Sequence, residues 1–475
     1  MKDLNLALMC LAVFALLATV AVRRKPKINA TRIGIAPGPF CLYLPAAKRQ
    51  FATNGHRLVE QGYMQLKNSN FVVQTQDMER LVIAPKFLSE LRMLPESKLS
   101  HSAALVEKNL GFYSSVDTIL ESHQHSDVCR VQLTQNLPHL IPAMSDELDF
   151  AMSQFFDACN SEQFTAYPTY GCVLRPYPPA LRPLLRPFLA PKSRMTGILA
   201  NAQKVLIPAI EARQISKNTY NDLLQFLVET YKDGQPMPII LKLLVLTAAA
   251  LHTSTMAAVN ALYDICARPE YINSLRDEAH AALSTDGGSW QLSTIKQLKR
   301  LDSFLKESLR FTQPDTRKLF RRFREGEANF DSVGFNRKVL SSVKLSDGVT
   351  ILPTGTFINM AAGPMSRDPT FYDEPNTFNG YRFYSPDGGA AQPPAHDFTG
   401  IEPGNVAWGS GRLTCPGRWY ASAMNKLMVA SLLVCYDIQF PEGQSTRPPS
   451  IYSDGTIMPS PTQEILFRER PVRAF

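Results

Sequence analysis

The chain has 475 residues, of which 45% are hydrophobic and 19% charged, and its formal net charge is +8. These values are typical of a folded globular protein and exclude a disordered or fibrous chain. A basic balance is compatible with nucleic acid, an anionic membrane surface or an acidic protein partner, and also with charge spread evenly over the surface. The sequence has no basic run with interleaved aromatic residues and no zinc-finger pattern, so we expect no nucleic acid among its partners.

The eight cysteines are far apart in the sequence, and none forms a C-x-x-C pair. This spacing argues against a disulfide framework and against a zinc site. It fits a reducing compartment in which most thiols are small core residues.

The N-terminal segment Leu4–Val22 is a run of 19 uncharged residues, long enough to cross a bilayer as a helix. The basic cluster Arg23–Lys27 follows at once and favours a cytosolic position for the rest of the chain. A cleaved signal peptide is the alternative, but the basic cluster lies where a cleavage site with small residues would be required. We predict a transmembrane anchor over 1–22, a basic and proline-rich linker over 23–45, and a globular domain over 46–475.

The first half of the chain has weak secondary-structure patterns. We expect a helix over Lys48–Gly62, two short strands within Tyr63–Gln74, and helical spacing again over Glu79–Arg92. The stretch Ser145–Phe188 has no clear period and is rich in proline from Pro168 onward.

The second half is patterned more strongly. A long helix is predicted over Pro238–Ala267, and two more over Glu270–Leu283 and Ser293–Phe311, the last with Ser293 as its N-cap. The period then changes to two, which predicts strands at Val339–Leu345, Val349–Leu352 and Thr356–Met360. A last helix is expected over Pro416–Tyr436. The whole pattern predicts a mostly α fold with a small β portion.

The sharpest chemical signal is the segment AWGSGRLTCPGR over residues 407–418, which places Cys415 at the end of a glycine-rich loop and at the start of the last helix. The free N–H groups and the positive dipole end of a helix N-terminus stabilise a thiolate. A thiolate axial ligand donates electron density to haem iron and favours cleavage of the O–O bond. A buried structural cysteine at a helix start is the alternative.

This segment resembles the haem-binding loop of the cytochrome P450 family, F-x-x-G-x-[RH]-x-C-x-G, and matches it at both glycines and at Cys415. Trp408 stands where the family has phenylalanine. Leu413 stands where the family has a basic residue that pairs with a haem propionate, and we expect the neighbouring Arg412 to serve instead. The resemblance implies the cytochrome P450 fold, haem b as cofactor and Cys415 as the ligand to its iron.

Further matches follow in the family's order. Glu307 and Arg310 form an E-x-x-R element, whose spacing places both side chains on one face of a helix. The resemblance makes them a structural ion pair with Arg382 as the third member. It also assigns Arg337, on an expected strand, and Arg130 to the residues that bind the haem.

The long helix carries His252 and Thr253 where family members have an acid and a threonine at an oxygen-binding kink. The resemblance implies that the Thr253 hydroxyl bonds to bound oxygen and relays protons. The alternative is a threonine bonded to its own helix carbonyl. His252 stands in the place of the acid, and a proton relay and a structural role are equally open for it.

The resemblance implies a monooxygenase that inserts one oxygen atom from O₂ into an apolar small molecule. Electrons are expected from NADPH through a flavoprotein reductase that docks on the basic side near Cys415. Membrane lipid is the other expected partner, and the endoplasmic reticulum the expected location, with the domain in the cytosol. The sequence looks like fungal members, which by analogy indicates secondary metabolism and a terpenoid as one such substrate.

A catalytically inactive membrane protein with the same fold is the alternative function. The stretch Leu148–Arg182 is shorter than in family members, which carry two more helices there. The segment Thr316–Phe330, with seven charges, reads as a surplus insert that we expect to lie in solvent.

Overall fold

The computed structural model describes residues 28–36, 43–75, 78–109, 111, 116–154, 191–216, 220–231, 235–312, 334–386, 396–453 and 456–471. The predicted anchor over 1–22, residues 155–182 of the shortened stretch and the expected insert Thr316–Phe330 lie outside these residues.

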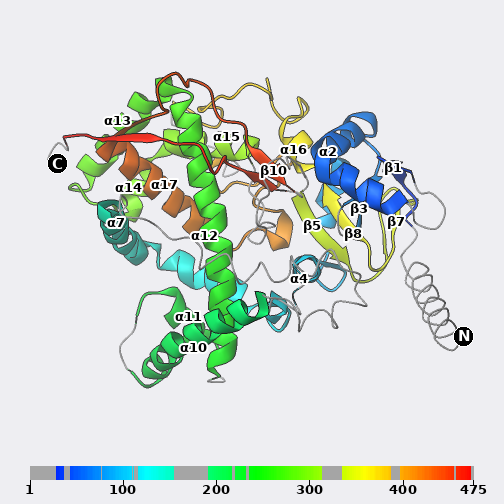
Figure 1. Cartoon of the computed structure of the whole chain (residues 1–475), viewed down its shortest axis with the longest axis horizontal. Helices are drawn as coiled ribbons and strands as arrows, with labels where there is room; N and C mark the ends of the chain where they lie inside the picture. Colours follow the sequence, from blue (N-terminus) through cyan, green and yellow to red (C-terminus); the bar gives the residue numbers. More distant parts are fainter. Residues whose placement is uncertain are drawn as a thin grey trace, which may run out of the picture.

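A β-rich part and a larger helical part lie side by side (Figure 1). The described residues of the β-rich part form a six-stranded sheet with the order β1-β2-β3-β8-β5-β4. Its strands are β1 (Thr31–Ile33), β2 (Phe71–Gln74), β3 (Glu79–Val82), β4 (Leu99–Ser100), β5 (Gly334–Val339) and β8 (Phe357–Met360). Helix α2 (Tyr43–Gln65) packs on this sheet, and their apolar residues share one core.

The helical part surrounds the long helix α12 (Pro236–Cys266), which packs against α15 (Lys299–Phe311) and α17 (Arg418–Cys435) (Figure 1). The other described helices of eight or more residues are α4 (His101–Lys108), α7 (Leu137–Gln154), α10 (Pro191–Ile215), α11 (Leu223–Thr230) and α13 (Ile272–Thr285). Shorter helices are α3 (Leu88–Leu91), α6 (Gln124–Asp127), α14 (Leu292–Gln297) and α16 (Ala362–Ser366), and a π-helical turn spans Val128–Leu133. Three small antiparallel pairs complete the described β structure: β6 (Val343–Lys344) with β7 (Ile351–Leu352), β9 (Tyr436–Gln439) with β12 (Leu466–Glu469), and β10 (Ile451–Ser453) with β11 (Thr456–Met458). The predicted mostly α fold with a small β portion is confirmed.

Among the described residues, α12 is the one helix long and apolar enough to cross a membrane. Its C-terminal half nevertheless contributes to the main helical core with Ala261, Leu262 and Ile265. Lys242 interrupts its N-terminal half and is buried, and its ammonium donates to the carbonyl of Thr118 at 2.6 Å. These contacts hold both halves of α12 against other parts of the protein.

Three predictions for the first part of the chain were wrong. Helix α2 extends through Gln65, so Tyr63–Gln74 contains one strand, β2, instead of two. The segment Glu79–Arg92 begins with β3, which lies between β2 and β8 and has three consecutive buried residues; a strand covered on both faces lacks the alternation that identifies strands. The predicted linker 23–45 contains β1, which pairs in parallel with β2 and therefore belongs to the sheet.

The helix predicted over Ser293–Phe311 is two helices. Gln291 is the N-cap of α14, and its side chain and that of Thr294 form a reciprocal capping box, so Ser293 lies inside the first turn. Leu298, with φ −72° and ψ 68°, separates α14 from α15. The amphipathic period continues through this break, which is why the sequence pattern does not reveal it.

A buried ionic network joins α15 to the loop that follows α16. The Arg310 guanidinium donates to both carboxylate oxygens of Glu307 at 2.8 Å, and neither side chain is exposed. The Arg382 Nε lies 3.2 Å from the same two oxygens. Arg310 also donates to the carbonyls of Ser366 at 2.6 Å and Pro375 at 2.7 Å. One carboxylate therefore balances two arginines and fixes three segments of the chain.

We expect Glu307→Gln to lower the free energy of unfolding by about 3–5 kcal/mol, because two buried or half-buried guanidinium groups lose their counter-charge. Glu270→Gln, at an exposed position of the same fold, is the matched control and should change stability by less than about 0.5 kcal/mol. Urea unfolding followed by circular dichroism measures both. Equal midpoints for the two variants would show that the network is not a stabilising element.

Candidate functional site

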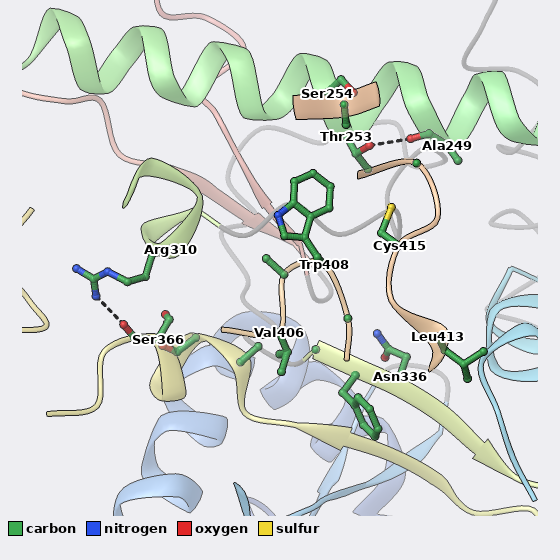
Figure 2. A pocket seen from close by; sticks show the side chains of 18 of the residues that line it. Ala249, Thr253, Ser254, Arg310, Asn336, Ser366, Val406, Trp408, Leu413 and Cys415 are labelled. Atoms are coloured by element: carbon green, nitrogen blue, oxygen red, sulfur yellow. Dashed lines mark hydrogen bonds between the residues drawn. The ribbon is translucent and has the colours of Figure 1, made fainter. Parts of the chain in front are cut away.

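A cavity of about 1100 Å³ lies between α12, β5, α2 and the loop that leads into α17. Figure 2 shows the sulfur of Cys415 directed toward the part of α12 that carries Ala249 and Thr253. Much of the wall is apolar, with Leu246, Ala249, Ala250, Val406, Leu413, Tyr420 and Met424. A thiol therefore faces small residues of a helix across an apolar space.

The start of α17 positions Cys415. Gly417 is the N-cap of this helix, and the backbone N–H of Cys415 donates to the carbonyl of Trp408 at 2.7 Å. Burial raises the pKa of the Cys415 thiol, whereas the N–H groups of Gly417 and Arg418 and the charge of Arg418 oppose that rise. The net shift is upward, so the group is a neutral thiol until a metal ion binds and displaces its proton.

The loop before Cys415 is held closely. Gly409 and Gly411 have φ angles of 77° and 68°, the left-handed region that favours glycine. A Cβ on Gly411 would lie 2.2 Å from the carbonyl oxygen of Arg92. The Trp408 indole donates to the carbonyl of Phe398 at 2.7 Å, so the aromatic residue next to the thiol is also fixed.

Thr253 lines the cavity, and its hydroxyl donates to the carbonyl of Ala249 at 2.9 Å (Figure 2). The bond to its own helix is thus present. A hydroxyl has one proton and two lone pairs, so Oγ1 can still accept a hydrogen bond from the cavity. His252 is half-buried and is absent from the described lining of the cavity, and burial lowers its pKa.

The cationic residues expected at the site are distributed unevenly. Arg337, on β5, is buried and lines the cavity. Arg412 is exposed, while its neighbour Leu413 faces the cavity. Arg130 is also exposed, 3.9 Å from Asp127, and is not among the described lining residues. The structure therefore brings Arg337 to the cavity but neither Arg412 nor Arg130.

Two lining residues were missed by the sequence analysis. His101 lies at the start of α4, with its Nδ1 3.2 Å from an Arg337 nitrogen. Phe335 lies on β5 with a φ of 54°, beside a register shift between Gly334 and Arg337. Such an irregularity places the Phe335 ring under the Arg337 guanidinium, 4.3 Å away. Neither residue belongs to a local motif, so no sequence signal identified them.

These features fit haem. A flat group with apolar faces suits the apolar wall, and its iron requires the thiolate of Cys415. Its carboxylates require cations, and Arg337 is a buried cation that makes no ion pair with the residues the structure describes.

Gly411→Ala should lower the free energy of unfolding by more than Gly287→Ala. Both glycines have a φ near 67°, which costs a side chain about 1–3 kcal/mol, but only Gly411 also has a neighbour in the way. The space around Gly287 is open within 4 Å, so the difference between the variants measures the contact with Arg92. Thermal unfolding of both variants tests this, and equal shifts would show that the loop relaxes freely.

Comparison with known proteins identifies the family. The family model "Cytochrome P450" matches residues 152–326 and 329–467. The chain is 30% identical to cytochrome P450 monooxygenase AN1598 of Emericella nidulans, over 89% of this chain and 85% of that protein. It is 29% identical to an ent-kaurene oxidase of Gibberella intermedia, with the same coverage. The fold is similar to the crystal structure of the cytochrome P450DA heme domain, with a TM-score of 0.66 at 15% identity over 94% of this chain and 99% of that one. The chain therefore belongs to the cytochrome P450 family of monooxygenases.

Proposed function

We propose that this protein uses haem b to insert one oxygen atom from O₂ into an apolar small molecule. The observation that carries the proposal is the thiol of Cys415, which faces the α12 wall of a cavity that the buried cation Arg337 also lines. Cys415 would bind the iron through its thiolate, and Arg337 would bind one carboxylate of the cofactor. When bound, haem supplies the activation of O₂ and the transfer of an oxygen atom.

The residues of α12 that face Cys415 would determine the space in this part of the cavity and the delivery of protons to it. Ala249 and Ala250 leave room on this wall, and the bond from Thr253 to the Ala249 carbonyl holds the hydroxyl at the edge of the cavity. From there Oγ1 can hold a proton and pass it into the cavity. The surrounding apolar side chains exclude water and favour an apolar substrate.

The substrate class rests on the wall of the cavity and on the relatives. A similar protein is named ent-kaurene oxidase, and another, 28% identical over 91% of this chain and 89% of that protein, is monooxygenase paxP of Penicillium paxilli. These names support a role in fungal secondary metabolism, with a terpenoid as the substrate.

Electrons would come from NADPH through a flavoprotein reductase. Arg412 lies in the loop before Cys415 and, like Arg130, is exposed. Burial lowers the pKa of Arg418, and the charge of Arg130 lowers it further. The Arg130 and Arg418 side chains are therefore close together. A positive surface next to the thiolate ligand suits an acidic partner.

The sequence of the N-terminal segment Leu4–Val22 supports a single-pass anchor in the endoplasmic reticulum, with the catalytic domain in the cytosol and in contact with lipid. Fractionation of the full-length chain tests this location. Recovery in the soluble fraction, or secretion with a new N-terminus, would contradict it.

A catalytically inactive protein with this fold is the second candidate, favoured by Leu413 at the cavity wall and by the shortened Leu148–Arg182. The CO-bound spectrum of the reduced protein separates the two. We expect a thiolate-type Soret band from the wild type and its complete loss in Cys415→Ser, because an alcohol oxygen is a poor soft ligand for iron. Cys435→Ser changes a half-buried cysteine away from the described lining and should keep the band. If the wild type lacks the band, the inactive alternative holds.

Thr253→Ala should retain haem and release reduced oxygen as peroxide, with product per NADPH lowered roughly 100-fold, the lower end of what a positioned proton donor contributes. Thr253→Ser keeps the hydroxyl and should preserve most of the coupling. Thr255→Ala, at an exposed position of the same helix, is the control for helix stability. Unchanged coupling in Thr253→Ala would mean that protons reach the cavity without this hydroxyl.

A further inference from the structure

Arg337 is a cation in an environment that should not hold one alone. The residue is 3% exposed, and its Nη1 donates to the carbonyl of Asn336 at 2.8 Å. Burial lowers the pKa of Arg337 to about 10, although the charge of Glu96 opposes that shift, so the guanidinium is charged at neutral pH. It forms no ion pair within the described part of the chain. A buried charge without a counter-ion is destabilising, so this site is completed by an anion.

His101 lies at the same corner of the cavity. The pairing of β4 with β5 joins Ser100 to Lys338 and brings the start of α4 next to Arg337. The His101 Nδ1 lies 3.2 Å from the Arg337 Nη1 and 3.2 Å from the carbonyl oxygen of Asn336. Both His101 and Arg337 line the cavity.

The backbone that carries His101 is fixed by its neighbours. The Ser100 hydroxyl accepts from the Ala103 N–H at 2.9 Å and caps α4. Glu96 Oε1 accepts from the Ser100 hydroxyl at 2.7 Å and from the Ser102 N–H at 3.0 Å. Glu96, whose charge acts on Arg337, thus holds the helix start through Oε1 and forms no ion pair with Arg337 among the described residues.

The remaining basic residues on the described cavity wall are His56, Lys67, Arg310 and Arg367. Arg310 pairs with Glu307 and Lys67 with Asp368, while Arg367 is exposed. Burial, with a smaller contribution from the charge of Arg57, lowers the pKa of His56 to about 4, so that it is neutral. The corner formed by Arg337 and His101 is therefore where unbalanced positive charge meets the cavity.

We propose that His101 and Arg337 together bind one propionate carboxylate of the haem, and that His101 supplies the polar contact that Leu413 cannot make. This inference rests on the proposed haem-dependent function. An imidazole N–H from α4 and a guanidinium from β5 would give one carboxylate two charge-assisted or polar hydrogen bonds from different elements of the fold. His101 acts on the haem through the propionate carboxylate of the haem. The effect of replacing His101 should therefore disappear when that carboxylate is absent.

The test is the rate at which the protein loses its cofactor. The holoprotein is mixed with an excess of a haem-accepting apoglobin, and the transfer is followed by absorbance. His101→Phe keeps a ring of similar shape and should release haem about 10-fold faster than the wild type. His123→Phe, at an exposed position outside the described cavity lining, should leave the rate unchanged.

The same measurement with iron protoporphyrin IX dimethyl ester, whose carboxylates are blocked, separates recognition from structure. We expect the wild type and His101→Phe to release the ester at equal rates. Adding Leu413→Arg to His101→Phe should restore slow haem release, because it returns a cation to the cavity wall. If His101→Phe does not fold, His101→Asn is compared with the wild type on haem and on the ester in the same way.

Three results would overturn the inference: haem release unchanged in the His101 variants, release of haem and ester accelerated equally, or a wild type without haem. The last is distinguishable because the wild-type CO-bound spectrum is then absent as well, and the proposed function fails with it. In the first two cases the thiolate spectrum remains, and only the role of His101 is lost.

Discussion

The carboxylate of Glu307 is the contact on which the arrangement of the site depends. It is unexposed and is shared by Arg310 and Arg382, which in turn hold the carbonyls of residues between 366 and 377. Those carbonyls belong to the end of α16 and to the irregular chain that follows it. Because desolvated charges are costly unless every partner is in place, the network tolerates one geometry. The long irregular path from α16 to Cys415 therefore begins at a fixed point.

The cavity sets the orientation of a flat ligand by separating charge from apolar surface. Under the proposed function, the thiol of Cys415 would determine where the iron lies, and the corner of Arg337 and His101 would determine where a carboxylate lies. The Leu413 side chain makes another part of the cavity wall apolar. A ligand with one metal centre and carboxylates at one edge would meet both requirements in few orientations, and this would leave the α12 side of the cavity for the substrate.

The second half of the chain could be predicted because its signals are local. The periodicity of α12 and α15, the E-x-x-R spacing and the loop before Cys415 each lie within a short stretch of sequence. Other features depend on distant segments. His101 reaches Arg337 only because β4 pairs with β5, more than 230 positions apart. Whether Arg412 or Leu413 faces the cavity depends on the 3₁₀ turn Gly411–Leu413, whose direction the motif does not specify.

The helices α10 and α11 were missed for a different reason. Helix α10 contains Pro208 in its interior, and its apolar residues do not follow a single stripe, so its sequence lacks an amphipathic period. Its stability comes from packing: Ile210 is fully buried in a cluster with Phe226 and Leu227 of α11 and Ile239 of α12. Tertiary contacts can support a helix that its own sequence does not indicate.

Helix α12 meets two requirements that conflict within one sequence. It must be apolar, because one face lines the cavity and another lies in the core, and this makes it resemble a membrane span in composition. It must also be held at a fixed depth, which apolar contacts alone do not specify. Two buried charged residues fix the depth of α12. Lys242 bonds to Thr118 near one end, and Asp264 near the other pairs with Arg268 and Arg447, each at 2.9 Å. Both are fixed to other segments, so the helix cannot slide without leaving a charge unpaired, and Thr253 between them stays opposite Cys415.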